Sequence, residues 1–475
     1  MTAEAKRWQA LTLVCVAYFT TILDASIVNV ALPSIGRDLK YSATGLQWVV
    51  TTYAITFGGF LLIGGRAGDL LGRRRMFMSG LVLFSLASLL CGLAVSDSML
   101  VASRALQGIG AAVISPATLA IITTAFVEGG ERNKALGIWG AMGGVGAAAG
   151  LLFGGLLTRY AGWEWIFFVN VPVCLALLAL TRSIIRESKA PGLGHGFDAI
   201  GAVSVTGGLA LLVYAISEAP NSGWGSAETI LLFAVAAAIL AFFVLWETKA
   251  ASPLMPLRIF RLRTVAGANA VSVLIGAVII SGFFLLTLYV QNVLGYSALK
   301  TGLTFLATAG TVIVFAALSQ ALTTRIGPRP VMAFGLALLC GGMLWYTQIP
   351  VDGKYAVDLL PGYLMVGLGL AFSIIPVSIA ALSGVAPQET GVASGLLNTS
   401  QQIGGAIGVA ISSTLFISRF KDLSAAGATT REALTGGYTW AFWLLAGLAA
   451  VGVLLTLLMV RPQLGKAPAS AAHFG

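Results

Sequence analysis

The sequence predicts an all-α polytopic membrane protein with fourteen membrane-spanning helices. Of its 475 residues, 57% are hydrophobic and only 10% are charged, and the mean hydropathy is +0.92. Soluble domains carry about 25% charged residues, so this composition is not that of a soluble protein. Apolar runs of about 18 residues or more, the length that a helix needs to cross ~30 Å of hydrocarbon, occur about fourteen times.

The predicted spans leave almost no chain for a soluble domain. Eight residues precede the first span, too few for a cleaved signal peptide, so we expect this span to remain as an anchor. The predicted spans are residues 9–32, 46–66, 76–95, 99–121, 135–158, 166–184, 199–217, 229–248, 264–290, 301–323, 331–349, 359–382, 393–416 and 438–460.

The net charge of +10 raises the question of a nucleic-acid partner, but the positions of the charges argue against one. If the N-terminus is cytoplasmic, the loops on that side hold 19 of the 28 Lys and Arg residues, the outer loops hold 8, and Arg104 lies within a span. This is the positive-inside bias of membrane proteins. With an even number of spans, it predicts a multi-pass protein of the cell (plasma or inner) membrane, with both termini in the cytoplasm and no nucleic-acid partner.

Repeated features indicate two related halves, as in many transporters. Three glycine pairs recur at 258 residues, a proline pair at 260 and a loop glycine pair at 255: Gly137 and Gly395, Gly146 and Gly404, Gly150 and Gly408, Pro116 and Pro376, Gly72 and Gly327. This offset leaves room for two helices between two sets of six. We predict a six-helix bundle over 1–190, an inserted two-helix segment over 191–255, a second six-helix bundle over 256–461 and a disordered cytoplasmic tail over 462–475.

One aspartate and one arginine lie deep within the apolar spans. Asp24 lies ~25 Å along a helix from the basic residues at the N-terminus, in the outer half of the first span. Arg104 lies at a similar depth in the fourth span, so the two side chains can pair if their helices are neighbours. Thr20 and Thr21 precede Asp24 by one turn and are expected to hydrogen-bond its carboxyl group. Gln107, one turn after Arg104, is expected to orient the arginine.

Charged groups are costly in hydrocarbon and usually face a bundle interior or an aqueous cavity. We interpret Asp24 as a proton or cation site. Its pairing with Arg104 favours the carboxylate, desolvation favours the neutral acid, and water entering or leaving a cavity would change the balance. The alternative for Asp24 is a structural carboxyl group satisfied by neighbouring helices. For Gln107 the alternative is ordinary hydrogen bonding between helices.

Two glycine-rich segments have different interpretations. In "GGVGAAAGLLFGG" (143–155), Gly146, Gly150 and Gly154 recur every four residues and form a stripe for close helix packing, whereas a dinucleotide site would need a preceding strand. In "GGRAGDLLGRRR" (64–75), which joins two spans, Asp69 is expected to cap the following helix and Gly72 to permit a tight turn. The alternative for this loop is a topology anchor with no moving role.

These motifs resemble the major facilitator superfamily, and in particular its fourteen-helix drug/proton antiporter branch. "RALQGIGAA" is similar to the fourth-helix motif and carries Arg104 and Gln107. "LDASIVNVALP" resembles the first-helix signature of the branch, with Asp24, Asn29 and Pro33 on motif positions. "WEWIFFVNVP" and "PLMPLRIFR" are also typical of the branch, so the resemblance covers essentially the whole chain. The loop 64–75 is similar to the loop between helices two and three, with Gly65, Asp69, Gly72, Arg73 and Arg74 on motif positions.

The resemblance implies the major-facilitator fold, in which two six-helix bundles rock around a central cavity, here with two inserted helices. It implies outward export driven by inward proton flow, with Asp24 as the coupling carboxylate and Arg104 as its electrostatic partner. The motif residues of the loop 64–75 would form a cytoplasmic gate. The chain departs from the family pattern at two positions: Leu151 follows Gly150 where the family usually has proline, and Glu164 stands where arginine is common.

The leading hypothesis is a proton-coupled secondary active exporter of amphipathic small molecules such as drugs or antibiotics, and not an enzyme. It needs no cofactor, because the proton gradient drives it. Its partners are a small-molecule substrate, protons and the lipid bilayer, and we expect a functional monomer. Asp24 is the only acid near the middle of a span, which favours neutral or singly charged substrates. The substrate-cavity candidates are Asn29, Trp48, Tyr53, Gln107, Tyr289, Gln291 and Asn398.

Other functions fit the sequence less well. Within transport, the runner-up is an exporter or importer of one endogenous metabolite or lipid. A membrane enzyme needs clustered acid–base or metal-ligating groups, but His195 and His473 lie outside the spans and the four cysteines lack metal-ligand spacing. No Walker A motif supports an ATP-driven pump, and no repeated filter supports a channel.

Overall fold

The structure is a computed structural model that describes residues 3–41, 45–126, 130–189, 198–250, 253, 257–385 and 390–461. The predicted disordered tail, 462–475, lies outside the described residues, and so does most of the connection before the inserted helices. The described part consists of helices and their connections and contains no strand.

The helices follow one another along the chain with short connections. The first half contains α1 (Ala3–Asp38), α2 (Gln47–Leu71), α3 (Arg73–Gly92), α4 (Asp97–Ala125), α5 (Gly130–Tyr160), α6 (Trp165–Phe168) and α7 (Asn170–Ile184). The insertion contains α8 (Ala199–Ser222) and α9 (Ala227–Glu247). The second half contains the short η1 (Leu257–Arg261), α10 (Arg263–Asn292), α11 (Ala298–Ile326), α12 (Pro328–Tyr346), the π-helical turn η2 (Tyr355–Leu359), α13 (Leu360–Ala381), α14 (Thr390–Ala425) and α15 (Thr430–Met459).

Every predicted span lies on a helix, which confirms the all-α membrane fold. Twelve helices of the described chain are long and apolar enough to cross a membrane, and α2 and α5, of 25 and 31 residues, cover the other two predicted spans. The sixth span is interrupted at Val169, between α6 and α7. Several helices extend beyond the predicted spans; α1 has 36 residues and ends at Asp38. Hydropathy marks only the part of a helix that suits hydrocarbon, whereas the backbone stays helical until a cap or turn ends it.

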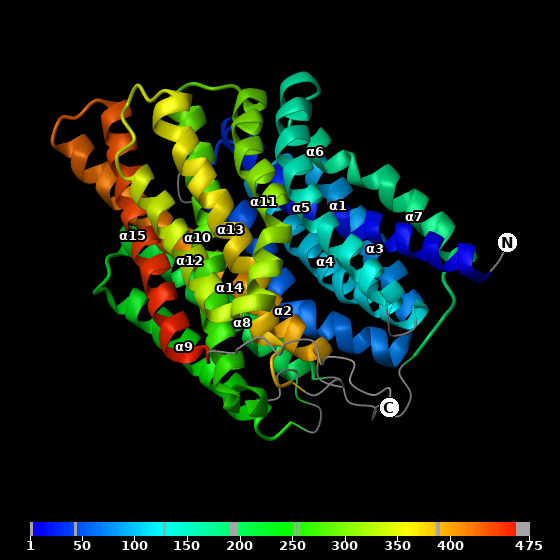
Figure 1. Cartoon of the computed structure of the whole chain (residues 1–475). Coiled ribbons are helices and arrows are strands. Elements are labelled where there is room, and N and C mark those ends of the chain that lie inside the picture. The colour runs from blue at the N-terminus through cyan, green and yellow to red at the C-terminus, as the bar shows by residue number, and fades with distance from the viewer. Residues whose placement is uncertain are drawn as a thin grey trace.

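The two halves repeat the same helix pairings. In the first half α1 packs against α5, and α4 packs against both α2 and α3; in the second half α10 packs against α14, and α13 packs against both α11 and α12. The halves meet where α2 contacts α14 and where α5 contacts α11. Figure 1 shows the first half in blue to blue-green beside the second half in green to red. We keep the boundaries at residues 190 and 255 as an interpretation of this pairing.

The inserted hairpin lies where the two halves meet. The helices α8 and α9 pack against each other, and α8 also contacts both α2 and α14. On one side, the hydroxyl of Thr414 on α14 donates a hydrogen bond to the carbonyl oxygen of Ile216 on α8 at 3.1 Å. On the other side, Thr206 of α8 occupies the space that a Cβ at Gly59 of α2 would need. The helix α8 therefore bridges the two halves.

A stripe of glycines lets α5 pack closely on α1. A Cβ added at Gly150 would collide with the hydroxyl of Ser26 and lie 2.7 Å from the carbonyl oxygen of Leu23. A Cβ at Gly154 would lie 2.6 Å from the carbonyl oxygen of Ile27, and one at Gly146 would also contact the backbone of α1. The structure thus places the stripe at a crossing of two helices, and not on a loop between a strand and a helix.

We expect Gly150→Ala to destabilise the fold. The added methyl group meets the backbone of α1, which cannot rotate away, and overpacking of this kind costs about 1–3 kcal/mol. The unfolding temperature of the purified protein in detergent checks this prediction. Gly207→Ala on α8 is the matched control, because a Cβ there meets nothing within 4 Å. Equal unfolding temperatures for the two variants would contradict the close packing of α5 on α1.

Candidate functional site

Asp24 is fully buried on α1 and accepts hydrogen bonds from three side chains. Arg104 Nη1 donates to its Oδ2 at 2.8 Å, Gln107 Nε2 donates to its Oδ1 at 2.8 Å, and Asn170 Nδ2 donates to the same oxygen at 2.7 Å. Taking a carboxylate out of water costs several kcal/mol unless it is both paired and hydrogen-bonded. The arrangement around Asp24 meets both requirements.

Arg104, on α4, is as deeply buried as its partner, with 1% of its surface exposed. Besides pairing with Asp24, its Nη1 donates to Gln107 Oε1 at 2.6 Å, and its Nε donates to the carbonyl oxygen of Val49 on α2 at 3.0 Å. The guanidinium carbon lies 4.2 Å from the centroid of the Tyr53 ring, a cation–π contact. The positive charge is therefore satisfied by α1 and α2 as well as by its own helix.

Ser88 and Asn170 complete the network, and neither was among the residues predicted from the sequence. The hydroxyl oxygen of Ser88 on α3 accepts from Gln107 Nε2 at 3.1 Å and from Asn170 Nδ2 at 3.0 Å, and it donates to the carbonyl oxygen of Phe167 at 2.8 Å. Asn170, at the start of α7, carried a usable signal, because it is the only side-chain amide in the sixth apolar run. Ser88 carried none, since serine is common in membrane helices.

The structure brings Asp24, Arg104 and Gln107 together, at the common depth that residue counting predicted. The predicted bonds from the two threonines to Asp24 are wrong. Thr20 Oγ1 donates to the carbonyl oxygen of residue 16 and Thr21 Oγ1 to that of residue 18, both at 2.8 Å. A threonine within a helix satisfies its hydroxyl on the preceding turn. The carboxylate, meanwhile, is occupied by a charged donor and two amides.

The predicted cavity residues of the first half have different surroundings. Tyr53 and Gln107 belong to the buried network around Asp24, and both are almost fully buried. Asn29 donates to the carbonyl oxygens of residues 25 and 26 at 3.3 Å, and its Oδ1 is buried without a partner among the described residues. The Trp48 ring lies 6.4 Å from that of Tyr214 on α8, so it contacts the inserted hairpin.

The predicted cavity residues of the second half are dispersed. The hydroxyl of the buried Tyr289 donates to the carbonyl oxygen of Pro350 at 2.5 Å. Gln291 Nε2 donates to the carbonyl oxygen of Val30 at 2.8 Å and so joins the two halves. Asn398 is exposed on α14. Because the structure does not gather these side chains around one space, their role in substrate binding stays a prediction.

The connection between α2 and α3 is held by Glu187, a residue that no sequence motif indicated. Gly72 separates the two helices with a φ of 116°, a conformation that favours glycine. Glu187, after α7, accepts from the backbone N–H groups of Arg74 and Arg75 at 3.0 and 3.2 Å. This carboxylate therefore occupies the positively polarised N-terminus of α3. Arg73 extends to α4, where its Nη1 donates to the carbonyl oxygen of residue 120 at 3.3 Å and to the Thr124 hydroxyl.

Asp69 is not the N-cap residue of α3. Asp69 lies in the last turn of α2, and the N-cap position of α3 belongs to Gly72. The helix α2 continues to Leu71, beyond the predicted span, so Asp69 is still within α2. The side chain of Asp69 lies outside what the structure describes. Gly65 lies within α2, where a Cβ added to it would be 3.5 Å from the Cβ of Pro116 on α4.

Close contacts join the halves at the end of the molecule opposite the Gly72 connection. The Gln291–Val30 hydrogen bond lies there, near the ends of α10 and α1. A Cβ at Gly155, near the end of α5, would lie 2.7 Å from the carbonyl oxygen of Ala298, at the start of α11. Nearer the middle of the helices, the Thr399 hydroxyl of α14 donates to the carbonyl oxygen of residue 58 on α2 at 3.1 Å.

We expect Arg104→Gln to destabilise the protein by about 3–5 kcal/mol, because it leaves the Asp24 carboxylate buried without its charge partner. The double variant Asp24→Asn/Arg104→Gln should recover much of this loss, since no uncompensated charge remains. Unfolding measurements on the native protein, both single variants and the double variant form a double-mutant cycle. Strictly additive losses would show that the two side chains do not stabilise each other.

Comparisons with known proteins agree with this architecture. The family model described as "Major Facilitator Superfamily" matches residues 14–409. The structure is similar to that of a bacterial homologue of the human lysosomal transporter Spinster, in an inward-facing and occupied conformation. The TM-score is 0.67 and the sequence identity 15%, over 98% of this chain and 99% of the other, so this likeness concerns the fold alone.

Two curated relatives align over most of their length. The puromycin resistance protein pur8 of Streptomyces alboniger is 39% identical over 459 residues, which are 95% of this chain and 90% of the relative. The cephamycin export protein CmcT of Amycolatopsis lactamdurans is 39% identical over 405 residues, 85% of this chain and 83% of the relative. The family model and these relatives together show that the chain belongs to the major facilitator superfamily.

Proposed function

We propose that this protein exports amphipathic small molecules, such as antibiotics, across the cell membrane in exchange for protons. Its relatives pur8 and CmcT are named for puromycin resistance and cephamycin export, and they align with most of the chain. The observation that supports proton coupling is the buried ion pair of Asp24 and Arg104. An ionisable pair inside a membrane span is expensive to maintain and usually marks an ion pathway or a proton relay.

The network around Asp24 suits a group that gains and loses a proton. If Asp24 is protonated, Arg104 keeps its bonds to the Val49 carbonyl and to Gln107, and it keeps the face of Tyr53. The guanidinium group therefore still has interaction partners. The amide of Asn170 donates to the carboxylate and, after rotation, can accept from the carboxylic acid, because an amide carries both kinds of group.

Protonation would change the forces between several helices at once. The network joins α1, α3, α4 and α7 through side chains, and Arg104 also reaches the backbone of α2. Removing the negative charge cancels the attraction between α1 and α4 and weakens the hydrogen bonds that the carboxylate accepts. A ligand or proton shifts a conformational equilibrium only by binding one state better than the other. We infer that Asp24 binds its proton with different affinity in the two transport states.

The positive-inside bias of the sequence supports a cytoplasmic location for both termini and for the connection between α2 and α3. The contacts between the halves at the opposite end would then close the outer face in this structure. Arg73, Arg74 and Glu187 would tie the cytoplasmic ends of α3, α4 and α7 together within the first half. In this proposal a single chain operates as a transporter, with no enzymatic step and no cofactor.

We expect Asp24→Asn to abolish concentrative transport while leaving the protein folded. The asparagine keeps the shape and the hydrogen-bonding capacity of the side chain but cannot carry a proton. The measurement is accumulation of puromycin, within a panel of antibiotics, by proteoliposomes with an imposed pH gradient. Asp352→Asn, in an exposed connection of the second half, is the control and should transport like the native protein.

Two outcomes would overturn different parts of this proposal. If Asp24→Asn still accumulates the drug against its gradient, Asp24 is not the coupling group. If the native protein accumulates drugs equally well after a protonophore collapses the gradient, transport is not coupled to protons. Equilibration of the drug by Asp24→Asn down its own gradient, without accumulation, is the result expected for a transporter that has lost only its coupling.

A further inference from the structure

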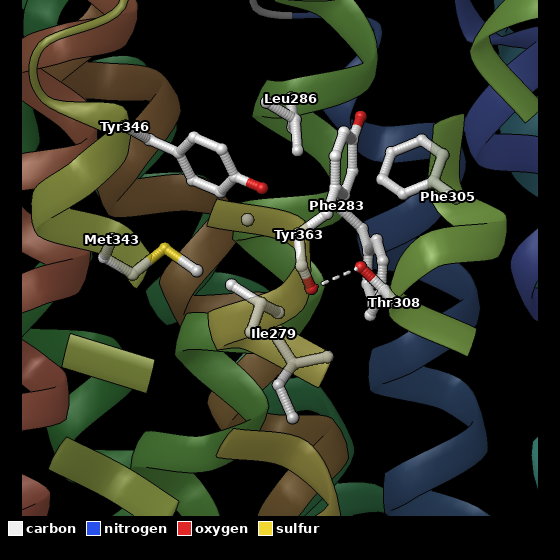
Figure 2. A pocket seen from close by; sticks show the side chains of 10 residues that line it. Ile279, Phe283, Leu286, Phe305, Thr308, Met343, Tyr346 and Tyr363 are labelled. Atoms are coloured by element: carbon white, nitrogen blue, oxygen red, sulfur yellow. Dashed lines mark hydrogen bonds between the residues drawn. The ribbon is translucent and has the colours of Figure 1, made fainter. Parts of the chain in front are cut away.

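The second half contains a small pocket lined by residues of α10, α11, α12 and α13. Its walls are almost entirely apolar and include Phe283, Phe305, Met343, Tyr346 and Tyr363. The cavity volume is about 10 Å³, room for one water molecule in this conformation. Figure 2 shows these side chains converging from the surrounding helices, with the hydroxyl of Tyr346 directed inward.

Glycine contacts show which residues of the two halves correspond. Gly108 of α4 lies over the backbone of Tyr53 on α2, with a Cβ position 2.7 Å from its carbonyl oxygen. Gly367 of α13 lies in the same way over Thr308 of α11, at 2.8 Å. Residues of α4 are thus matched by residues of α13 that lie 259 positions later, and residues of α2 by residues of α11 that lie 255 positions later.

A second glycine contact gives the same correspondence for the third helix of each half. A Cβ at Gly110 of α4 would lie 2.7 Å from the backbone nitrogen of Phe84 on α3. A Cβ at Gly369 of α13 would lie 2.8 Å from the backbone nitrogen of Leu339 on α12. The offsets are again 259 residues between α4 and α13 and 255 residues between α3 and α12.

These offsets place the pocket at the position of the Asp24 network in the other half. Tyr363 corresponds to Arg104, 259 residues earlier, and Tyr346 corresponds to Cys91, 255 residues earlier. Thr308 and Met343, which also line the pocket, correspond to Tyr53 and Ser88. Arg104 and Tyr363 also contact corresponding positions: Arg104 Nε donates to the carbonyl oxygen of residue 49, and the Tyr363 hydroxyl forms a hydrogen bond with the side-chain hydroxyl of Thr304, 255 residues after it, at 2.9 Å.

The chemistry of the two sites is nevertheless different. The site in the first half is filled by a charge pair and amides, whereas the pocket in the second half carries no charged side chain among its described walls. The ring of Tyr363 lies 5.2 Å from that of Phe305 and 6.1 Å from that of Tyr346, both edge to face. The Tyr346 hydroxyl is buried and has no hydrogen-bond partner in the part of the chain that the structure describes. Leaving such a group unpaired costs about 1–3 kcal/mol.

We propose that this pocket binds an uncharged aromatic ring that bears one hydrogen-bonding group, which pairs with the Tyr346 hydroxyl. Aromatic walls offer a ring edge-to-face contacts, and the unpaired hydroxyl supplies the single polar contact. An apolar cavity with one polar group holds water poorly, because a buried water needs two to four polar partners. The first half thus provides the charge chemistry, and the corresponding site of the second half provides ring recognition.

Binding of a ring requires the walls of the pocket to part, because the present cavity has room for only one water molecule. Met343 is flexible and unbranched, and a side chain of this kind adapts to irregular guests. The π-helical turn η2, a form of backbone often found at functional sites, precedes α13, and its Tyr355 ring lies 6.1 Å from Tyr363. That binding at this pocket serves export rests on the function proposed above, whereas the binding itself does not.

A comparison of naphthalene with 2-naphthol tests the pocket. The two probes share one ring system, and only 2-naphthol carries a hydroxyl for Tyr346. Binding is measured by equilibrium dialysis of protein-containing nanodiscs against protein-free nanodiscs, without a proton gradient. We expect the native protein to bind 2-naphthol about fivefold more tightly than naphthalene, the effect of one neutral hydrogen bond. Tyr346→Phe should remove this preference without lowering the unfolding temperature, because it deletes an unpaired hydroxyl.

Three further variants keep the result independent of folding defects. Gly282→Ala adds a methyl group that points at the end of Met343, 3.2 Å away. This variant should bind both probes more weakly than the native protein. Gly310→Ala on α11, where a Cβ meets nothing within 4 Å, should bind both like the native protein. Tyr438→Phe, a buried tyrosine on α15 outside the pocket, should keep the preference for 2-naphthol.

The proposal is wrong if the native protein retains neither probe above the protein-free nanodiscs, or if Tyr346→Phe keeps the fivefold preference. Because no gradient is applied, these results are independent of the coupling experiment with Asp24→Asn. Ring binding without proton-driven accumulation would leave the pocket established and overturn the antiport proposal. Proton-driven accumulation without ring binding would do the reverse.

Discussion

The arrangement of the first half depends on the cost of holding two charges in the interior of a membrane protein. Asp24 and Arg104 are both almost completely buried, so each must find its counter-charge and its remaining hydrogen bonds within the protein. The donors and acceptors come from α1, α2, α3, α4 and α7. Five helices are therefore fixed relative to one another by a single pair of charges. The close approach that this requires is possible because glycines, such as Gly108 and Gly150, face the neighbouring backbones.

Much of this arrangement could be predicted from the sequence, because the physics of the bilayer is simple. Apolar runs of sufficient length predicted every spanning helix, and counting residues along the helices put Asp24 and Arg104 at the same depth. The recurrence of glycines at matching offsets predicted two related halves. A single sequence is enough to recognise these features, because each depends only on residue type and spacing.

The remaining details depend on which helices become neighbours, which spacing does not reveal. Thr20 and Thr21 lie on the expected side of Asp24, but their hydroxyls donate hydrogen bonds to backbone carbonyl oxygens of their own helix. Asn170 reaches Asp24 from a helix 146 residues away in sequence, and Glu187 caps α3 from 112 to 113 residues away. The dispersed positions of Tyr289, Gln291 and Asn398 have the same origin, because an aromatic or amide residue in a span has many possible neighbours.

The position of α8 between α2 and α14 has a consequence for the symmetry of any motion. The most extensive contacts between the halves are those of α2 with α14 and of α5 with α11, and the inserted helix bridges the first of them through Ile216 and Thr206. A rocking movement that separates α2 from α14 must therefore break the contacts of α8 with one of these helices or bend it. The two lines of contact between the halves are thus unequal, because the inserted hairpin adds its own contacts to one of them and not to the other.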